Sequence, residues 1–255
     1  MVGNLLLRGM IVGVVAGLLA FAFARAFGEP QVDLAIAFEE QMSKAEAPAQ
    51  GAAQAEEPAL VSRETQAGLG LLTGILIYGA AVGGLFALAF ACVYGRLGRL
   101  GPRETAALLA LGAFLAVVLI PFLKYPANPP AVGNDETIAA RTELFFIMLV
   151  VSLAALAIGV AIARALWLGH GGFNAAAIGG AVALVIIIAA FYLLPDINEM
   201  PENFSAMVIW RFRVASLGIH AILWTTMGLL FGILAERSLA DHSRQAFPRR
   251  AAALN

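Results

Sequence analysis

The chain has 255 residues, of which 61% are hydrophobic and 13% are charged, and its formal net charge at pH 7 is −1. Soluble proteins carry about 25% charged residues, so the composition argues against a soluble domain, and the small net charge argues against nucleic-acid binding. The single cysteine, Cys92, excludes an internal disulfide and any paired-cysteine motif. Because no GxxxxGK[ST] stretch occurs, we do not expect ATP binding through a Walker loop.

The apolar residues fall into six long runs rather than into periodic stripes. Each run can cross a hydrocarbon core of about 30 Å at about 1.5 Å per residue, so each predicts a transmembrane helix. The runs are 5–27, 68–94, 105–123, 144–166, 175–194 and 214–235. We therefore predict an all-α integral membrane protein with a six-helix membrane domain over residues 1–235 and a tail over 236–255.

The loop charges predict the orientation of this domain. Loops and ends on one side carry nine cations and three acids, whereas the other side carries seven cations and fourteen acids. Cytoplasmic loops carry an excess of Lys and Arg, so we expect both termini and residues 236–255 to be cytoplasmic. The clearest inside loop contains Arg96, Arg99 and Arg103.

The first outer connection, residues 28–67, is the longest one. Apolar residues recur at every fourth position within 31–44, which predicts a surface helix with one apolar face. Residues 45–59 are mostly Ala, Glu, Gln and Pro. That composition cannot bury much apolar surface, so it predicts a disordered tether.

The second outer connection is the proline segment, residues 121–133, with the sequence PFLKYPANPPAVG. Proline has no backbone N–H and fixes φ, and it pushes the residue before it toward extended geometry. We therefore expect the preceding helix to end at Pro121. The stiff segment that follows would hold Lys124, Tyr125 and Asn128 in fixed directions at the membrane face. The alternative is that the prolines do no more than end a helix.

The third outer connection, residues 195–204, completes a pattern that recurs in all three. An outward helix ends near a proline, a polar loop follows, and an inward helix opens near an arginine. The prolines are Pro30, Pro121 and Pro195, and the arginines are Arg63, Arg141 and Arg213. Our hypothesis is three helical hairpins arranged as parallel repeats about an axis along the membrane normal. The alternative is that any six-span chain gives this pattern when it is aligned generously.

Acidic and amide side chains gather in these outer loops. Carboxylate and amide oxygens suit hard or borderline divalent cations, and a negative mouth raises the local cation concentration. The alternative is the ordinary chemistry of solvated loops. The candidate metal ligands are Glu29, Asp33, Asn128, Asp196, Asn198 and Glu199.

Other residues would support such a site. We expect Lys124, Arg211 and Arg213 to pair with the acids and keep them ionised, although that pairing could be wholly structural. His220 is the one ionisable residue well inside a span, which makes it a functional candidate. Its alternative is a neutral imidazole hydrogen-bonded to a neighbouring helix. The glycines of the span 68–94 predict close helix packing.

Several of these stretches together resemble one family of membrane proteins. They are GEP at 28–30, the proline segment at 121–133, LPDINEMP at 194–201 and WRFR at 210–213. The chain resembles CbtA, a family of probable cobalt transporter subunits. The resemblance implies a multi-pass protein of the bacterial inner membrane, linked to cobalt supply for cobalamin. It also implies a small one-span partner, CbtB, with a histidine-rich end.

The sequence therefore favours a cobalt permease subunit in which the oxygen ligands meet at an outer vestibule. Co²⁺ would be the transported ion, with no permanently bound cofactor and no catalytic residues, and a homo-oligomer is left open. One alternative is a scaffold that stabilises the small histidine-bearing partner without conducting. A second alternative is a membrane enzyme whose Lys124, Arg211 and Arg213 grip the phosphate of a lipid.

Overall fold

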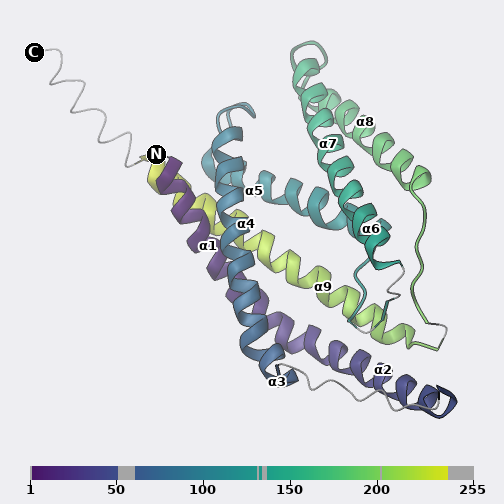
Figure 1. Ribbon diagram of the computed structural model, residues 1–255. Coiled ribbons are helices and arrows are strands. Elements are labelled where there is room, and N and C mark those ends of the chain that lie inside the picture. Colours follow the sequence, from purple (N-terminus) through teal and green to yellow (C-terminus); the bar gives the residue numbers. More distant parts are fainter. Residues whose placement is uncertain (1, 51–60, 131, 134–136, 202, 241–255) are drawn as a thin grey trace, which may run out of the picture. The chain divides into compact units, whose positions relative to one another are not determined.

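The computed structural model describes residues 2–50, 61–130, 132–133, 137–201 and 203–240 (Figure 1). Every regular element within these residues is helical. Six of the helices are long and apolar enough to cross a membrane, which confirms the predicted all-α fold with six spans. They cover Val2–Lys44, Arg63–Val93, Pro102–Lys124, Ile138–His170, Gly172–Leu193 and Ala206–Ala240. The side that each end faces stays a prediction.

Four of the spans contain a short π-helical turn within the described residues. Span one consists of α1 (Val2–Phe23), η1 (Ala24–Gly28) and α2 (Glu29–Gln50), and span two of α3 (Arg63–Thr65), η2 (Gln66–Gly70) and α4 (Leu71–Val93). Span three consists of α5 (Pro102–Ala113), η3 (Phe114–Leu119) and α6 (Ile120–Lys124). The last three spans are α7 (Ile138–His170), α8 (Gly172–Leu193), and α9 (Ala206–Thr226) with η4 (Met227–Phe231).

The chain divides into two compact units. Unit 1 comprises Met1–Ala26, Glu57–Leu111 and Gly218–Asn255. Unit 2 comprises Phe27–Glu56 and Gly112–Leu217. Each unit is described by itself below.

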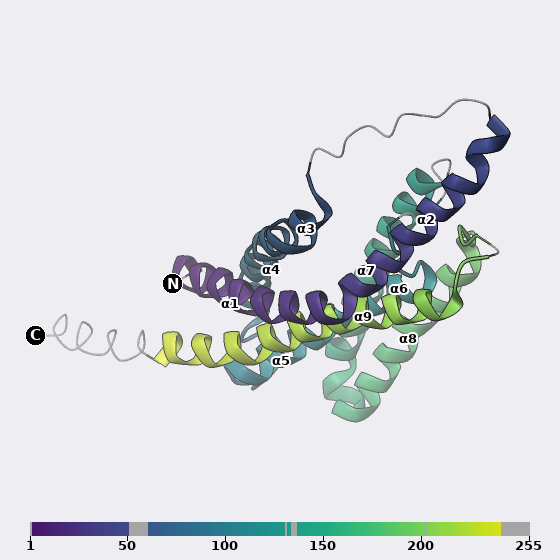
Figure 2. The ribbon, with the colours of Figure 1, turned by 90° about the horizontal axis from the view of Figure 1, so that it is seen from below.

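In unit 1, α1 and α4 pack with their backbones in contact, and they lie side by side in both views (Figures 1 and 2). A Cβ atom added at Gly13 would lie 1.9 Å from the carbonyl oxygen of Gly79, and one added at Gly83 would lie 2.2 Å from that of Gly9. No other residue fits at that distance, which confirms the predicted packing role for Gly79 and Gly83. Gly74, by contrast, faces open space.

Aromatic rings and charged side chains join the helices at one end of unit 1. Phe90 and Phe231 are fully buried, and their ring centroids lie 5.1 Å apart. Arg103 forms an ion pair with Glu236 at 2.6 Å. These contacts attach η4 and the residues after it to α4 and α5.

In unit 2, α7 and α8 form the closest pair of helices. A Cβ atom at Gly159 would lie 2.7 Å from the carbonyl oxygen of Gly179, so small residues again set the approach. α7 also packs against η3 and α6. The arrangement of three parallel hairpins stays a prediction.

The prediction that the third helix ends at Pro121 was wrong, because the span continues through α6 to Lys124. The turn before the proline is π-helical, so the amide of Ile120 bonds to the carbonyl of Leu115, five residues back. In that register the carbonyl of Ala116 would need the amide of residue 121, which proline lacks. The hydroxyl of Ser152 on α7 donates to Ala116 instead.

The same correction applies to Pro30, because η1 carries α1 directly into α2 without a break. The predicted surface helix over 31–44 is present, but it begins at Glu29 and extends to Gln50. Residues 45–50 of the predicted tether are therefore helical, and 51–59 lie outside the described residues. α2 packs against the loop between α8 and α9 in unit 2, where the rings of Phe38 and Phe204 meet edge to face at 4.9 Å.

Candidate functional site

The polar residues singled out from the sequence gather in unit 2, where the proline segment meets the loop that follows α8. Helix α6 ends at Tyr125, whose φ of −125° and ψ of 77° leave the helical range. Leu194 is extended, with ψ at 138°, because Pro195 follows it. The two loops thus leave their helices at defined residues, Tyr125 and Leu194, each directly before a proline.

Tyr125 joins the two loops. Its side chain is buried, and its hydroxyl donates to the carbonyl of Pro195 at 2.8 Å. Burial raises the pKa of the Tyr125 phenol above its ordinary value, and the nearby Asp196 carboxylate raises that pKa further. The hydroxyl therefore remains a donor at physiological pH.

Lys124 makes a second connection between the same loops. Its ammonium group donates to the carbonyl of Phe191 at 2.8 Å and forms an ion pair with Asp196. The Lys124 side chain is only 6% exposed, whereas that of Asp196 is 92% exposed. The predicted pairing is present, and the acid of the pair remains open to solvent.

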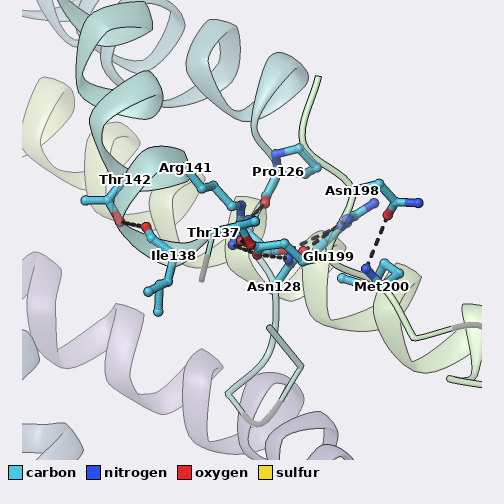
Figure 3. A network of polar contacts seen from close by, with 11 residues as sticks. Pro126, Asn128, Thr137, Ile138, Arg141, Thr142, Asn198, Glu199 and Met200 are labelled. Carbon is cyan, nitrogen blue, oxygen red and sulfur yellow. Dashed lines mark hydrogen bonds and ion pairs between the residues drawn. The ribbon is translucent and has the colours of Figure 1, made fainter. Parts of the chain in front are cut away.

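Glu199 lies at the centre of a buried set of contacts that we call the Glu199 network (Figure 3). Its side chain is 1% exposed, and its carboxylate accepts hydrogen bonds from three residues of two other segments. The donors are Thr137 at 2.7 Å, Arg141 at 3.1 Å and Asn128 at 3.3 Å. These donors take the place of water around the buried carboxylate oxygens.

Arg213 completes the network from α9. Its guanidinium donates to the carbonyl of Ala127 at 3.2 Å and to Oδ1 of Asn128 at 3.1 Å. Arg141 also donates to the carbonyl of Pro126. Asn128 therefore bridges an acceptor, Glu199, and a donor, Arg213, and the two arginines hold the carbonyls of the proline segment in place.

The remaining candidates lie in varied surroundings. Asn198 is exposed, and its Oδ1 accepts the amide of Met200 at 3.2 Å. Glu29 is 7% exposed at the start of α2, while Asp33 and Arg211 are exposed. Within the described residues, no three His, Cys, Asp or Glu side chains form a group that could hold a metal ion. The metal-binding role of the six candidates stays a prediction.

Sequence reasoning missed two members of the network, Thr137 and Arg141. It placed Arg141 only at the opening of an inward helix and did not mention Thr137. The available signal was an arginine about one turn before an apolar run, in a chain whose next predicted outer loop contains several acids. Such a cation can turn back toward the loops, but its partner depends on contacts between segments 58 residues apart.

His220 belongs to unit 1, whereas these loops belong to unit 2. Its ring packs edge to face on that of Tyr78, with centroids 6.5 Å apart. Its buried Nδ1 has no hydrogen-bond partner among the described residues. The alternative of a hydrogen bond to a neighbouring helix is therefore not realised at this atom.

Six apolar spans and a charged network at the ends of four of them define a multi-pass membrane protein with a structured polar face. No curated protein and no solved structure matches the chain. The family model described as probable cobalt transporter subunit (CbtA) matches residues 2–236. The chain belongs to this family, as the motifs of the outer loops predicted, and the family description makes it one subunit of a cobalt transporter.

Proposed function

We propose that this chain provides a path for Co²⁺ across the membrane, with an outer entrance beside the Glu199 network. The observation that carries the proposal is the hydrogen bond between Asn128 and Glu199, which joins loops 71 residues apart. It fixes the loop that contains Asp196 and Asn198, two exposed residues with oxygen atoms in their side chains. Membership of the cobalt transporter family supports Co²⁺ as the ion.

The two acids of this loop would have different tasks. Glu199 is enclosed, and a cation binding there would have to displace Arg141, Thr137 or Asn128. Removing one partner of a buried ion pair costs about 3–5 kcal/mol. Glu199 would therefore hold the loops together, while Asp196 and Asn198 would meet the incoming ion.

The Lys124–Asp196 pair would not prevent this. The Asp196 carboxylate is 92% exposed, so an ion can approach it from solvent, while the buried Lys124 ammonium keeps its hydrogen bond to the carbonyl of Phe191. A divalent cation interacts with a carboxylate about twice as strongly as Lys124 does at equal distance. Oxygen ligands hold Co²⁺ less firmly than imidazole does, which favours release toward the path.

The lipid-enzyme alternative gains less support. Lys124 donates to Phe191 and Asp196, and Arg213 donates to Ala127 and Asn128, so both cations already have protein acceptors. Of the three cations, Arg211 is the exposed one. The scaffold alternative rests on the tight glycine contacts of α1 and α4, which a conducting subunit would need as well.

Uptake of labelled Co²⁺ tests the proposal in cells that express this chain alone, its small partner alone, or both. Asp196→Asn should lower uptake about tenfold at low external Co²⁺ and less at saturating Co²⁺, because a capture ligand acts on affinity. The control is Glu39→Gln, which removes another exposed acid from α2 and should leave uptake unchanged. Equal uptake by Asp196→Asn and Glu39→Gln, at equal membrane amounts, would remove Asp196 from the entrance.

Glu199→Gln separates the two tasks. It should reduce the amount of folded protein as well as uptake, because Arg141 loses its buried counter-charge. Thermal stability in detergent measures this effect directly. A Glu199→Gln protein with unchanged stability and lost uptake would place Glu199 on the ion path instead.

A further inference from the structure

One side of α9 is exposed along its first turns. Met207, Trp210, Arg211 and Val214 stand at positions i, i+3, i+4 and i+7, which places them on the same face of the helix. All four residues are exposed, and the exposed fraction of Trp210 is 66%. Arg211 has no hydrogen-bond or ion-pair partner within the described residues, and α9 contains no acid. We call these four residues the Trp210 face.

The other side of the same turns is packed within unit 2. Val208 and Ile209 pack against a buried cluster that includes Phe204. Arg213 donates to Oδ1 of Asn128 and so belongs to the Glu199 network. These contacts hold the start of α9 in place from behind. The Trp210 face is therefore presented by a fixed helix, and none of its four residues takes part in the network.

The length of the span places this face at the level of the lipid headgroups. The span has 35 residues, whereas a hydrocarbon core of about 30 Å needs about 20 residues, so a centred span has about seven residues beyond the hydrocarbon at each end. Arg211 is the sixth residue of α9. Side chains on a helix lean toward its N-terminus, so the guanidinium extends toward the headgroups, while Val214 lies deeper.

The chemistry of the four side chains limits what can cover them. The guanidinium of Arg211 and the indole N–H of Trp210 donate hydrogen bonds and accept none. Their partner must therefore offer oxygen acceptors, and a negative charge on it strengthens the hydrogen bonds from the arginine. The apolar surfaces of Met207, Trp210 and Val214 favour hydrocarbon. Water supplies only the acceptors and an acyl chain only the hydrocarbon, whereas a phospholipid supplies both in adjoining parts.

We propose that the Trp210 face binds an anionic phospholipid, whose phosphate accepts hydrogen bonds from Arg211 and whose acyl chain lies along Val214. An anionic headgroup fits because Arg211 has no counter-charge within the described residues. The inference goes beyond the path for Co²⁺ and does not depend on it, and it requires no chemical step. It also gives a task to the first two residues of the WRFR stretch, whose last arginine serves the Glu199 network.

Lipid titration of the full chain in detergent, followed by native mass spectrometry, tests the affinity. Phosphatidylglycerol should bind more tightly than phosphatidylcholine. Arg211→Gln should weaken phosphatidylglycerol binding about fivefold, because one arginine near an anionic lipid surface contributes about 1 kcal/mol. The control Arg99→Gln removes an exposed arginine from the loop between α4 and α5 and should keep the wild-type affinity. No loss in Arg211→Gln, or an equal loss in Arg99→Gln, overturns the proposal.

Tryptophan fluorescence locates the bound lipid on the full chain in nanodiscs. The emission of Trp210 is obtained as the difference between the wild type and Trp210→Phe. Phosphatidylglycerol with brominated acyl chains should quench this emission more than brominated phosphatidylcholine at the same mole fraction. In an Arg211→Gln background the two lipids should quench it equally. Equal quenching by both lipids in the wild type overturns the proposal.

Two other occupants of the Trp210 face give different results in the same proteins. If inorganic phosphate displaces phosphatidylglycerol at equal concentration, the face is a general anion site and the lipid proposal is wrong. If Arg211→Gln leaves lipid binding unchanged but reduces co-purification of another transporter subunit, the face is a protein interface and the proposal is again wrong. Neither result bears on Co²⁺ uptake, so the two proposals can fail separately.

Discussion

The hydroxyl of Ser152 donates the hydrogen bond that the carbonyl of Ala116 cannot receive from Pro121, which has no N–H. Mutation can test whether one donor replaces the other. The Ser152 hydroxyl is fully buried and donates to the carbonyl of Ala116 on η3. The π-helical register assigns that carbonyl to the amide of residue 121, where proline has none. Ser152→Ala therefore leaves a carbonyl oxygen without a donor inside the membrane.

The expected cost follows from the lack of a substitute donor. Interhelical hydrogen bonds in membrane proteins contribute about 0.6 kcal/mol on average and up to about 1.7 kcal/mol, because a lost partner is commonly replaced. Here the amide of Ile120 is already bonded to Leu115, so no nearby amide can replace Ser152. An unsatisfied buried acceptor costs about 1–3 kcal/mol, and we expect Ser152→Ala to destabilise the protein by about 1.5–2 kcal/mol.

A double-mutant cycle decides whether this explanation is right. In a Pro121→Ala background, residue 121 regains its N–H, so Ser152→Ala should cost less than about 0.5 kcal/mol. The free energy of unfolding in mixed micelles is measured for all four proteins. Thr142→Val is the control, because the Thr142 hydroxyl donates at 2.7 Å to Ile138 within its own helix, where the helical ladder already satisfies that carbonyl. The same cost for Ser152→Ala in both backgrounds would refute the reasoning.

Two further predictions concern packing and pH. Gly83→Ala should cost about 1–3 kcal/mol because its Cβ would lie 2.2 Å from the carbonyl oxygen of Gly9, whereas Gly74→Ala, at an open position, should be neutral or stabilising in the same unfolding assay. The raised pKa of Tyr125 means that its neutral form is favoured by folding, so its contribution is complete below about pH 10 and is lost as the pH rises through the folded pKa. Tyr125→Phe should lower the free energy of unfolding by about 1 kcal/mol at neutral pH. The variant should also lack the part of the loss of stability at alkaline pH that comes from ionising the Tyr125 phenol. If stability falls with alkaline pH as steeply in the variant as in the wild type, the assignment is contradicted.

The six spans could be predicted because an apolar run of sufficient length has few other fates in a membrane protein. The helix ends near Pro121 and Pro30 were predicted wrongly for one physical reason. The usual rule assumes that a proline leaves the carbonyl four residues back without a donor. In a π turn the carbonyl that lacks a donor is instead the one five residues back. The local sequence also does not show that the hydroxyl of Ser152, on another helix, donates to the carbonyl of Ala116.

The candidate site was predictable in part. Acids and amides in short outer loops suggested that Asn128 and Glu199 would meet, and they do. The burial of Glu199 and the exposure of Asp196, three residues away, could not be predicted from their shared residue type. That difference depends on Arg141, which reaches Glu199 from the start of α7. No local sequence pattern reveals this contact, because Arg141 and Glu199 lie 58 residues apart.

Within the described residues, some buried polar groups have a partner in the chain and others do not. At Ala116 and at Glu199 the fold supplies a donor to each buried acceptor, even across helices. At His220 and Trp224 the described residues supply none. The same holds for Oε1 of Gln31 in unit 2. A buried polar group without a partner costs free energy, so the paired groups at Ala116 and Glu199 are the ones that stabilise the fold.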